Sequence, residues 1–69
     1  MTNEQIARKL DATAAGVAFY GEALREATAL PCAKDYRDML GRYSSGNATA
    51  TDHIALQELA NLIRAVSHT

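Results

Sequence analysis

The sequence predicts an all-α protein in which one long N-terminal helix is followed by two shorter helices. Apolar residues recur at intervals of three and four over most of the chain, which is the spacing of a buried helix face. The single proline, Pro31, and the Ser-Ser-Gly-Asn stretch at 44–47 divide this pattern into three segments. A chain of 69 residues is expected to form one helical domain, 1–69.

The long helix is predicted over about residues 3–29. Thr2 and Gln5 have the spacing of a capping box, and Asn3 is an alternative N-cap. The helix is expected to end before Pro31, because proline disfavours helical backbone at the residue that precedes it.

A heptad seam is predicted along this helix. Its members are Ile6, Leu10, Thr13, Val17, Tyr20, Leu24 and Ala27. Phe19 lies on another face among small residues, and the helix would contain two glycines, Gly16 and Gly21. Glycine inside a helix costs roughly 1 kcal/mol relative to alanine. Either this cost is tolerated in a long helix, or the small residues let another helix approach closely, which is the interpretation that we favour.

The second helix is predicted over about residues 32–44, beginning at Pro31 or shortly after because proline suits a first helical turn. Its apolar face comprises Cys32, Ala33, Tyr36, Met39, Leu40 and Tyr43. Gly46 is expected just past its end, where helices favour glycine.

The third helix is predicted over about residues 51–66. Its start is either a capping-box pair, Thr49 and Asp52, or an N-cap at Thr51. Its expected buried face comprises Ala55, Leu56, Leu59, Leu62, Ile63 and Val66. The last residues, 67–69, are expected to fray.

The two short helices together match the length of the long one, so we expect them to fold back along it. One apolar side of the long helix would then stay uncovered, and homodimerisation through it would complete a helical bundle. A core of this size rarely supplies more than about 3–5 kcal/mol. One cysteine cannot form an intrachain disulfide, and neither His53 nor His68 has a cysteine at metal-ligand spacing.

Composition argues against several classes of function. The formal net charge is −1 and basic residues do not cluster, so direct binding to nucleic acid is not expected. The chain has no run of about 20 apolar residues that would span a membrane. The N-terminal residues lack the features of a signal peptide, and the unpaired cysteine favours a cytoplasmic location.

No catalytic constellation is visible. Cys32 would need a histidine beside it to act as a nucleophile, and His53 is the sole candidate, at the start of another helix. The favoured interpretations are a small buried apolar residue for Cys32 and an exposed first-turn residue for His53. We therefore predict no enzymatic activity, no metal and no cofactor.

The remaining class of function is binding to another protein. Aromatic and methionine side chains are favoured at interface centres. The candidates for a partner or dimer interface are Phe19, Tyr20, Tyr36, Met39, Tyr43 and Ile54. Packing within the chain is the favoured interpretation for the tyrosines and Met39, which lie on helix stripes. Phe19 and Ile54 lie off the stripes, so contact with another molecule is favoured for them.

The opening residues, Met-Thr-Asn-Glu-Gln-Ile-Ala-Arg-Lys-Leu at 1–10, and Phe-Tyr-Gly-Glu-Ala-Leu at 19–24 carry a resemblance that extends over the whole chain. The chain resembles the small early proteins of Mu-like temperate Pseudomonas phages, and among them the quorum-sensing anti-activators. The resemblance implies a small helical dimer, acting in the host bacterial cytoplasm. It implies binding and inhibition of a host LuxR-type transcriptional regulator (LasR) and of the type IV pilus assembly ATPase (PilB). Two alternatives stay open, which are a small DNA-binding phage regulator and a structural helical adaptor.

Overall fold

The computed structural model describes residues 1–67, and this part of the chain is helical without any strand. The elements are α1 (Asn3–Ala14), α2 (Gly21–Thr28), the 3₁₀ helix η1 (Pro31–Tyr36), α3 (Arg37–Ser45) and α4 (Ala50–Ser67). The all-α prediction is therefore confirmed. Fraying was predicted for residues 67–69: Ser67 is instead the last residue of α4, and His68 and Thr69 lie outside the described residues.

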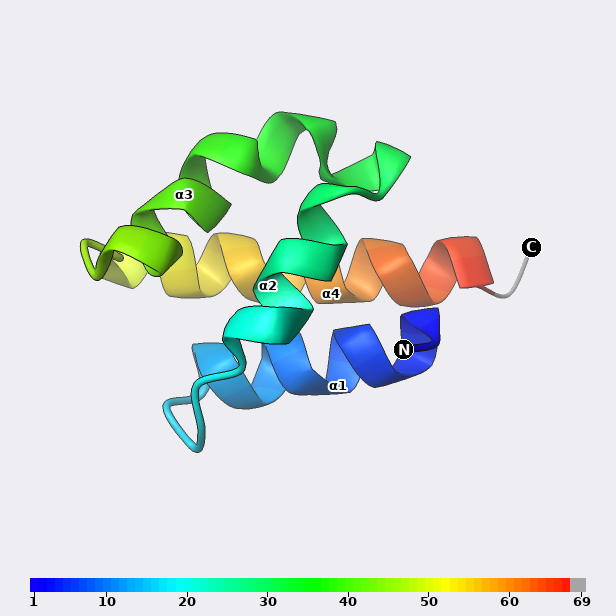
Figure 1. Cartoon of the computed structure of the whole chain (residues 1–69), viewed down its shortest axis with the longest axis horizontal. Helices are drawn as coiled ribbons and strands as arrows, with labels where there is room; N and C mark the ends of the chain where they lie inside the picture. The colour runs from blue at the N-terminus through cyan, green and yellow to red at the C-terminus, as the bar shows by residue number, and fades with distance from the viewer. Residues whose placement is uncertain (68–69) are drawn as a thin grey trace.

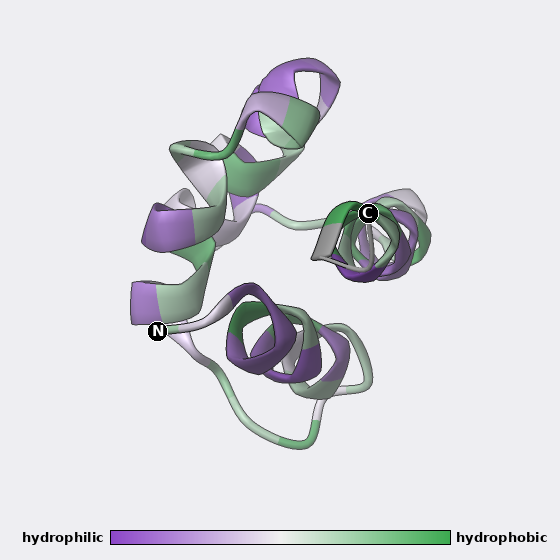
Figure 2. Ribbon diagram, turned by 90° about the vertical axis from the view of Figure 1, so that its right-hand side faces the viewer, coloured by the Kyte–Doolittle hydropathy of each residue, from purple (hydrophilic) through white to green (hydrophobic). Residues whose placement is uncertain are grey.

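The helices form two layers. α1 and α4 lie side by side and run in opposite directions, and they make the most extensive contact between any two elements (Figure 1). α2, η1 and α3 form a second layer that packs across this pair (Figure 2). The molecule measures 33 × 23 × 18 Å. A core therefore closes within a single chain.

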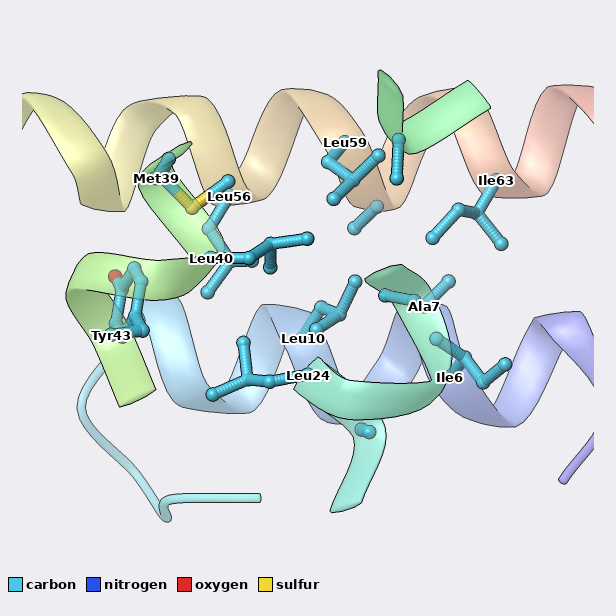
Figure 3. Close-up of a cluster of buried hydrophobic side chains, with 14 residues drawn as sticks. Ile6, Ala7, Leu10, Leu24, Met39, Leu40, Tyr43, Leu56, Leu59 and Ile63 are labelled. Atoms are coloured by element: carbon cyan, nitrogen blue, oxygen red, sulfur yellow. The ribbon is translucent and has the colours of Figure 1, made fainter. Parts of the chain in front are cut away.

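The core lies between the two layers and draws on every helix (Figure 3). Its members are Ile6, Ala7, Leu10, Ala23, Leu24, Ala27, Ala33, Met39, Leu40, Tyr43, Leu56, Leu59, Ala60 and Ile63. Full burial of one leucine side chain contributes about 1.5–3 kcal/mol, so the leucines at the centre supply much of the stabilising free energy.

The predicted single helix over 3–29 is wrong, because α1 and α2 are separate helices. Gly16 takes the left-handed conformation, with φ of +76°. The N–H of Gly16 donates to the carbonyl of Thr13 (3.2 Å), and the N–H of Val17 donates to that of Ala12 (3.0 Å). This is the Schellman pattern that ends a helix at a glycine.

The residues of the predicted heptad seam are buried on either side of this break and exposed at the break itself. Thr13 and Leu24 are buried, whereas Val17 and Tyr20 are exposed. Neither interpretation of the two glycines is correct, since Gly16 ends α1 and Gly21 begins α2. The turn lets α2 fold back and bury its own apolar face within the same chain. The expected slab of two short helices along one long helix is replaced by the two layers.

A helical segment does occupy the place predicted for the helix over 32–44, but its first half is a 3₁₀ helix rather than an α-helix. Leu30 is extended (φ −79°, ψ 139°), as expected before Pro31, and the chain then forms η1 before it continues as α3. The predicted apolar face does point inward, with Cys32 and Tyr36 partly buried and the other members buried. Gly46 has φ of +80° and ends α3, which confirms its predicted place.

α4 confirms the predicted helix over 51–66, but its buried face is rotated. Leu62 and Val66, which were expected inside, are exposed, whereas Asp52 and Ala60 are buried. The buried row centres on Asp52, Leu56, Leu59 and Ile63 at spacings of four, three and four. Asp52 lies on this row because α3 supplies a partner for its carboxylate.

Candidate protein-binding surface

The turn between α1 and α2 is the most exposed apolar part of the described chain. We call residues 15–20 the apolar turn; its sequence, Ala-Gly-Val-Ala-Phe-Tyr, carries no charge. Val17, Phe19 and Tyr20 are 79%, 62% and 38% exposed. The turn projects from the C-terminal end of α1, away from the N-terminus of the chain (Figure 1). Contiguous exposed apolar residues of this kind are typical of interaction sites.

Hydrogen bonds hold the apolar turn at both ends. The Schellman pattern at Gly16 ties its beginning to α1. At its end, the hydroxyl of the buried Thr13 accepts the N–H of Tyr20 (3.2 Å) and itself donates to the carbonyl of Lys9 (2.8 Å). Because the backbone is fixed before any partner arrives, binding would lose little conformational entropy there.

The two aromatic side chains of the turn also have neighbours that orient them. The ring of Phe19 lies against Gly21, where an added Cβ would come within 3.3 Å of its Cε1 atom. The ammonium of Lys9 lies 5.5 Å from the centroid of the Tyr20 ring, in a cation–π contact. The glycine that begins α2 therefore leaves room for the phenylalanine ring.

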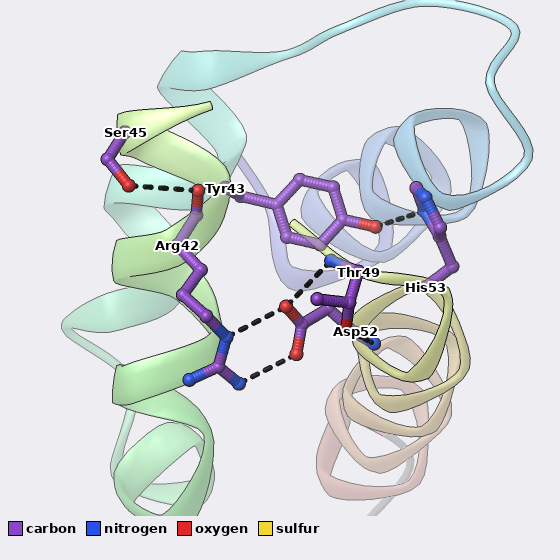
Figure 4. A network of polar contacts seen from close by, with 6 residues as sticks. All are labelled: Arg42, Tyr43, Ser45, Thr49, Asp52 and His53. Carbon is purple, nitrogen blue, oxygen red and sulfur yellow. Dashed lines mark hydrogen bonds and ion pairs between the residues drawn. The ribbon is translucent and has the colours of Figure 1, made fainter. Parts of the chain in front are cut away.

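A polar cluster fixes the junction of α3 and α4 (Figure 4). Arg42 donates two hydrogen bonds to Asp52 (2.8 and 2.7 Å), and the N–H of Thr49 donates a third (3.0 Å). The hydrogen bonds from Arg42, and then the one from the backbone of Thr49, hold the pKa of the Asp52 carboxyl well below its usual range.

The next residue of each helix joins the same cluster. Tyr43 and His53 share a hydrogen bond between the phenol and Nδ1, and their rings meet edge to face. Burial raises the pKa of the Tyr43 hydroxyl, and the nearby Asp52 charge raises it further. The expected exposure of His53 is wrong, because Tyr43 lies against it and leaves it half-buried. These contacts serve the junction, and the described residues hold no group of metal ligands.

An apolar pocket is lined by residues from the start of α1, from the segment at 30–32 and from near the end of α4. Its volume is about 410 Å³. It is lined by Asn3, Leu30, Pro31, Cys32 and Val66. Cys32 is half-buried against the core and faces this pocket, rather than being fully buried as expected.

The six candidate residues separate into three groups. Phe19 and Tyr20 come together in the apolar turn, whereas Ile54 is 60% exposed on the outer face of α4. The remaining three pack inside the chain: Tyr36 is half-buried, and Met39 and Tyr43 belong to the core. Sequence reasoning missed Val17, which the heptad pattern assigned to the seam. The glycine just before it was the signal that the helix ends there.

No helix among residues 1–67 is long and apolar enough to cross a membrane. Comparison of the chain with protein-family models, with curated proteins and with solved structures found no match.

Proposed function

We propose that the protein is a non-enzymatic binding module that docks its apolar turn into a partner protein. One observation carries this proposal: Val17 and Phe19 are largely exposed on a turn whose backbone is held at both ends. Aromatic side chains that enter a partner's pocket supply most of the binding energy at many interfaces. A fixed backbone adds to this by lowering the entropy cost of binding.

The distribution of charge favours a protein partner over nucleic acid. Three of the arginines face carboxylates of the chain itself: Arg42 pairs with Asp52, Arg64 with Asp11, and Arg8 with Glu4. Phosphate binding needs cations that are available to displace counterions. The apolar turn carries no charge, and a small DNA-binding regulator is therefore the weaker candidate.

The resemblance of residues 1–10 and 19–24 to phage anti-activators supports a more specific proposal. The partner would be a host LuxR-type transcriptional regulator, and the pilus assembly ATPase would be a second target. Phe19 and Tyr20 begin the second of these stretches and lie in the apolar turn. Capture of the regulator through this turn would inhibit it in the host cytoplasm without any chemical step.

The test compares two variants of matched exposure in a pull-down from host lysate, followed by titration of the captured protein. Phe19→Ala is expected to weaken binding by about 1–3 kcal/mol, since it removes the proposed anchor. Ile54→Asp is the comparison, because Ile54 is equally exposed but lies on α4, outside the apolar turn. The sequence predicted that both residues contact a partner, so a loss of affinity with Phe19→Ala alone would assign the contact to the turn. Equal affinity of Phe19→Ala and the unchanged protein would contradict the choice of surface.

The identity of the captured protein tests the target separately. A LuxR-type regulator, with or without the pilus ATPase, would support the inhibitor proposal. Capture of phage structural proteins would favour the helical adaptor, and capture of nucleic acid alone would contradict a protein-binding role.

A further inference from the structure

The apolar turn follows the end of α1, whereas the apolar pocket is lined by Asn3 at the start of α1 and by Val66 near the end of α4, which runs antiparallel to α1 (Figure 1 shows the two helices). One feature projects and the other is hollow. Because they lie apart, a single chain cannot fill its own pocket with its own turn.

The two features match in chemistry. Neither the turn, residues 15–20, nor the lining of the pocket contains a charged residue. The ammonium of Lys9 lies beside the Tyr20 ring, so Val17 and Phe19 are the side chains of the turn that would enter the pocket without burying a charge. Each includes one polar side chain, the Tyr20 hydroxyl in the turn and Asn3 in the pocket. These two groups are able to hydrogen-bond to each other across such a contact.

They also match in size. An apolar cavity of about 150 Å³ accepts a benzene ring. The pocket, at about 410 Å³, has room for the Phe19 ring together with a smaller neighbour such as Val17. Pro31 stiffens one wall of the pocket because its ring restricts the backbone.

We propose that the apolar turn of one copy seats in the apolar pocket of a second copy, so that the chain associates head to tail. This inference shares one premise with the proposed function, which is that the apolar turn is the element that binds. Such a contact joins two different surfaces, and unless the rotation between copies closes a ring, it continues from copy to copy. The large side chains of the turn are those of Val17, Phe19 and Tyr20. Together they bury much less than the roughly 800 Å² per partner of a standard interface, so the association is weak.

The experiment is sedimentation velocity on the full chain and three variants, at concentrations up to about 1 mM. Phe19→Asp disables the turn, Val66→Asp disables the pocket, and Ile54→Asp is a control on the outer face of α4. All three sites are exposed, and circular dichroism checks that each variant folds. The unchanged protein and Ile54→Asp are expected to gain mass with concentration, whereas Phe19→Asp and Val66→Asp each stay monomeric.

The decisive sample is the mixture of the two disabled variants. Phe19→Asp keeps a working pocket and Val66→Asp a working turn, so the mixture is expected to form a one-to-one dimer that grows no further. A mixture that stays monomeric while the unchanged protein associates would overturn the head-to-tail contact. So would an unchanged protein whose mass stops rising at that of a dimer and whose association neither Phe19→Asp nor Val66→Asp prevents. An unchanged protein that is monomeric at every concentration would overturn it too.

These outcomes are separate from those of the pull-down. If Phe19→Ala loses a foreign partner while the unchanged protein stays monomeric, the proposed function stands and the head-to-tail contact falls. If the mixture dimerises but the lysate yields no partner, the contact stands and the proposed function falls.

Discussion

The guanidinium of Arg42 meets the carboxylate of Asp52 through two parallel hydrogen bonds across the α3–α4 junction, at 2.8 and 2.7 Å. The same carboxylate accepts the N–H of Thr49 (3.0 Å), whose hydroxyl accepts the N–H of Asp52 in return (3.3 Å). Asp52 thus has two roles: it caps the start of α4 together with Thr49, and it links α4 to α3 through Arg42. Planar, two-pronged contacts of this kind are strong and directional.

Asp52→Asn is expected to lower stability at neutral pH and to flatten its dependence on acid. The folded-state pKa of Asp52 lies below its unfolded value, so the stability that it contributes is complete above about pH 4 and is lost as the pH falls through the lowered pKa. Denaturant titrations between neutral and acidic pH measure this. Asp35→Asn, at an exposed site in η1, is the control and should keep the slope of the unchanged protein. Parallel curves for Asp52→Asn and the unchanged protein would contradict the prediction.

Ionisation of Tyr43 is expected to lower the stability of the fold at high pH. The pKa of the Tyr43 hydroxyl is raised in the folded state, so the folded protein favours the neutral phenol. The contribution of this phenol to the free energy of unfolding is complete below about pH 10 and is lost as the pH rises through the raised pKa. Tyr43→Phe should lose about 1 kcal/mol at neutral pH with the hydrogen bond to His53, but resist alkali better. Tyr36→Phe serves as control and should retain the full alkaline loss. Denaturant titration at alkaline pH distinguishes the two variants.

Gly16→Ala is expected to destabilise the fold by about 1–2 kcal/mol, the cost of a left-handed backbone for a residue with a Cβ. No atom lies within 4 Å of the added methyl, so the cost comes from the backbone alone. Gly41→Ala is the matched control, since the site is equally open but lies inside α3. That variant should gain about 0.5–1 kcal/mol. If thermal melting showed the same sign for both, the left-handed turn would be in doubt.

Thr13→Val tests whether the apolar turn is held in place. The substitution keeps the shape but removes the acceptor of the Tyr20 N–H, at an expected cost of about 0.5–1.5 kcal/mol. Hydrogen exchange at the Tyr20 amide should accelerate, and affinity for the captured partner should fall with it. Thr28→Val is the control, because that hydroxyl bonds only to the carbonyl of Leu24 in its own helix (2.9 Å) among the contacts described. Unchanged exchange at Tyr20 would show that Thr13 does not hold the turn.

The rotated face of α4 is tested by two leucines of the same helix. Leu59→Ala removes a fully buried side chain and is expected to cost about 2–5 kcal/mol. Leu62→Ala, at a site that is 40% exposed, is expected to cost less than about 1 kcal/mol. Urea denaturation of the two variants gives the comparison. A cost for Leu62→Ala as large as that for Leu59→Ala would mean that Leu62 is buried as well, as the sequence pattern predicted.

Local signals were sufficient for several parts of the fold. The helical periodicity predicted an all-α chain and the place of α4. The capping box of Thr2 and Gln5 forms as predicted, as does the pair at the start of α4, and Gly46 ends α3. Each depends on residues no more than a few positions apart, so the sequence determines them without reference to the rest of the molecule.

Only the tertiary structure decided where the first helix breaks and what is exposed. A glycine at 16 costs about 1 kcal/mol in a continuous helix, which is too little to decide locally between helix and turn. Burial of α2 against α1, η1 and α3 is worth several kcal/mol and favours the turn over a continuous helix. The hydrogen bond from the Tyr20 N–H to the Thr13 hydroxyl favours it further. The pocket likewise joins residues at 3, 30–32 and 66, which no local pattern brings together. Periodicity specifies which faces are apolar, whereas the packing of the layers determines which of those faces stay open to a partner.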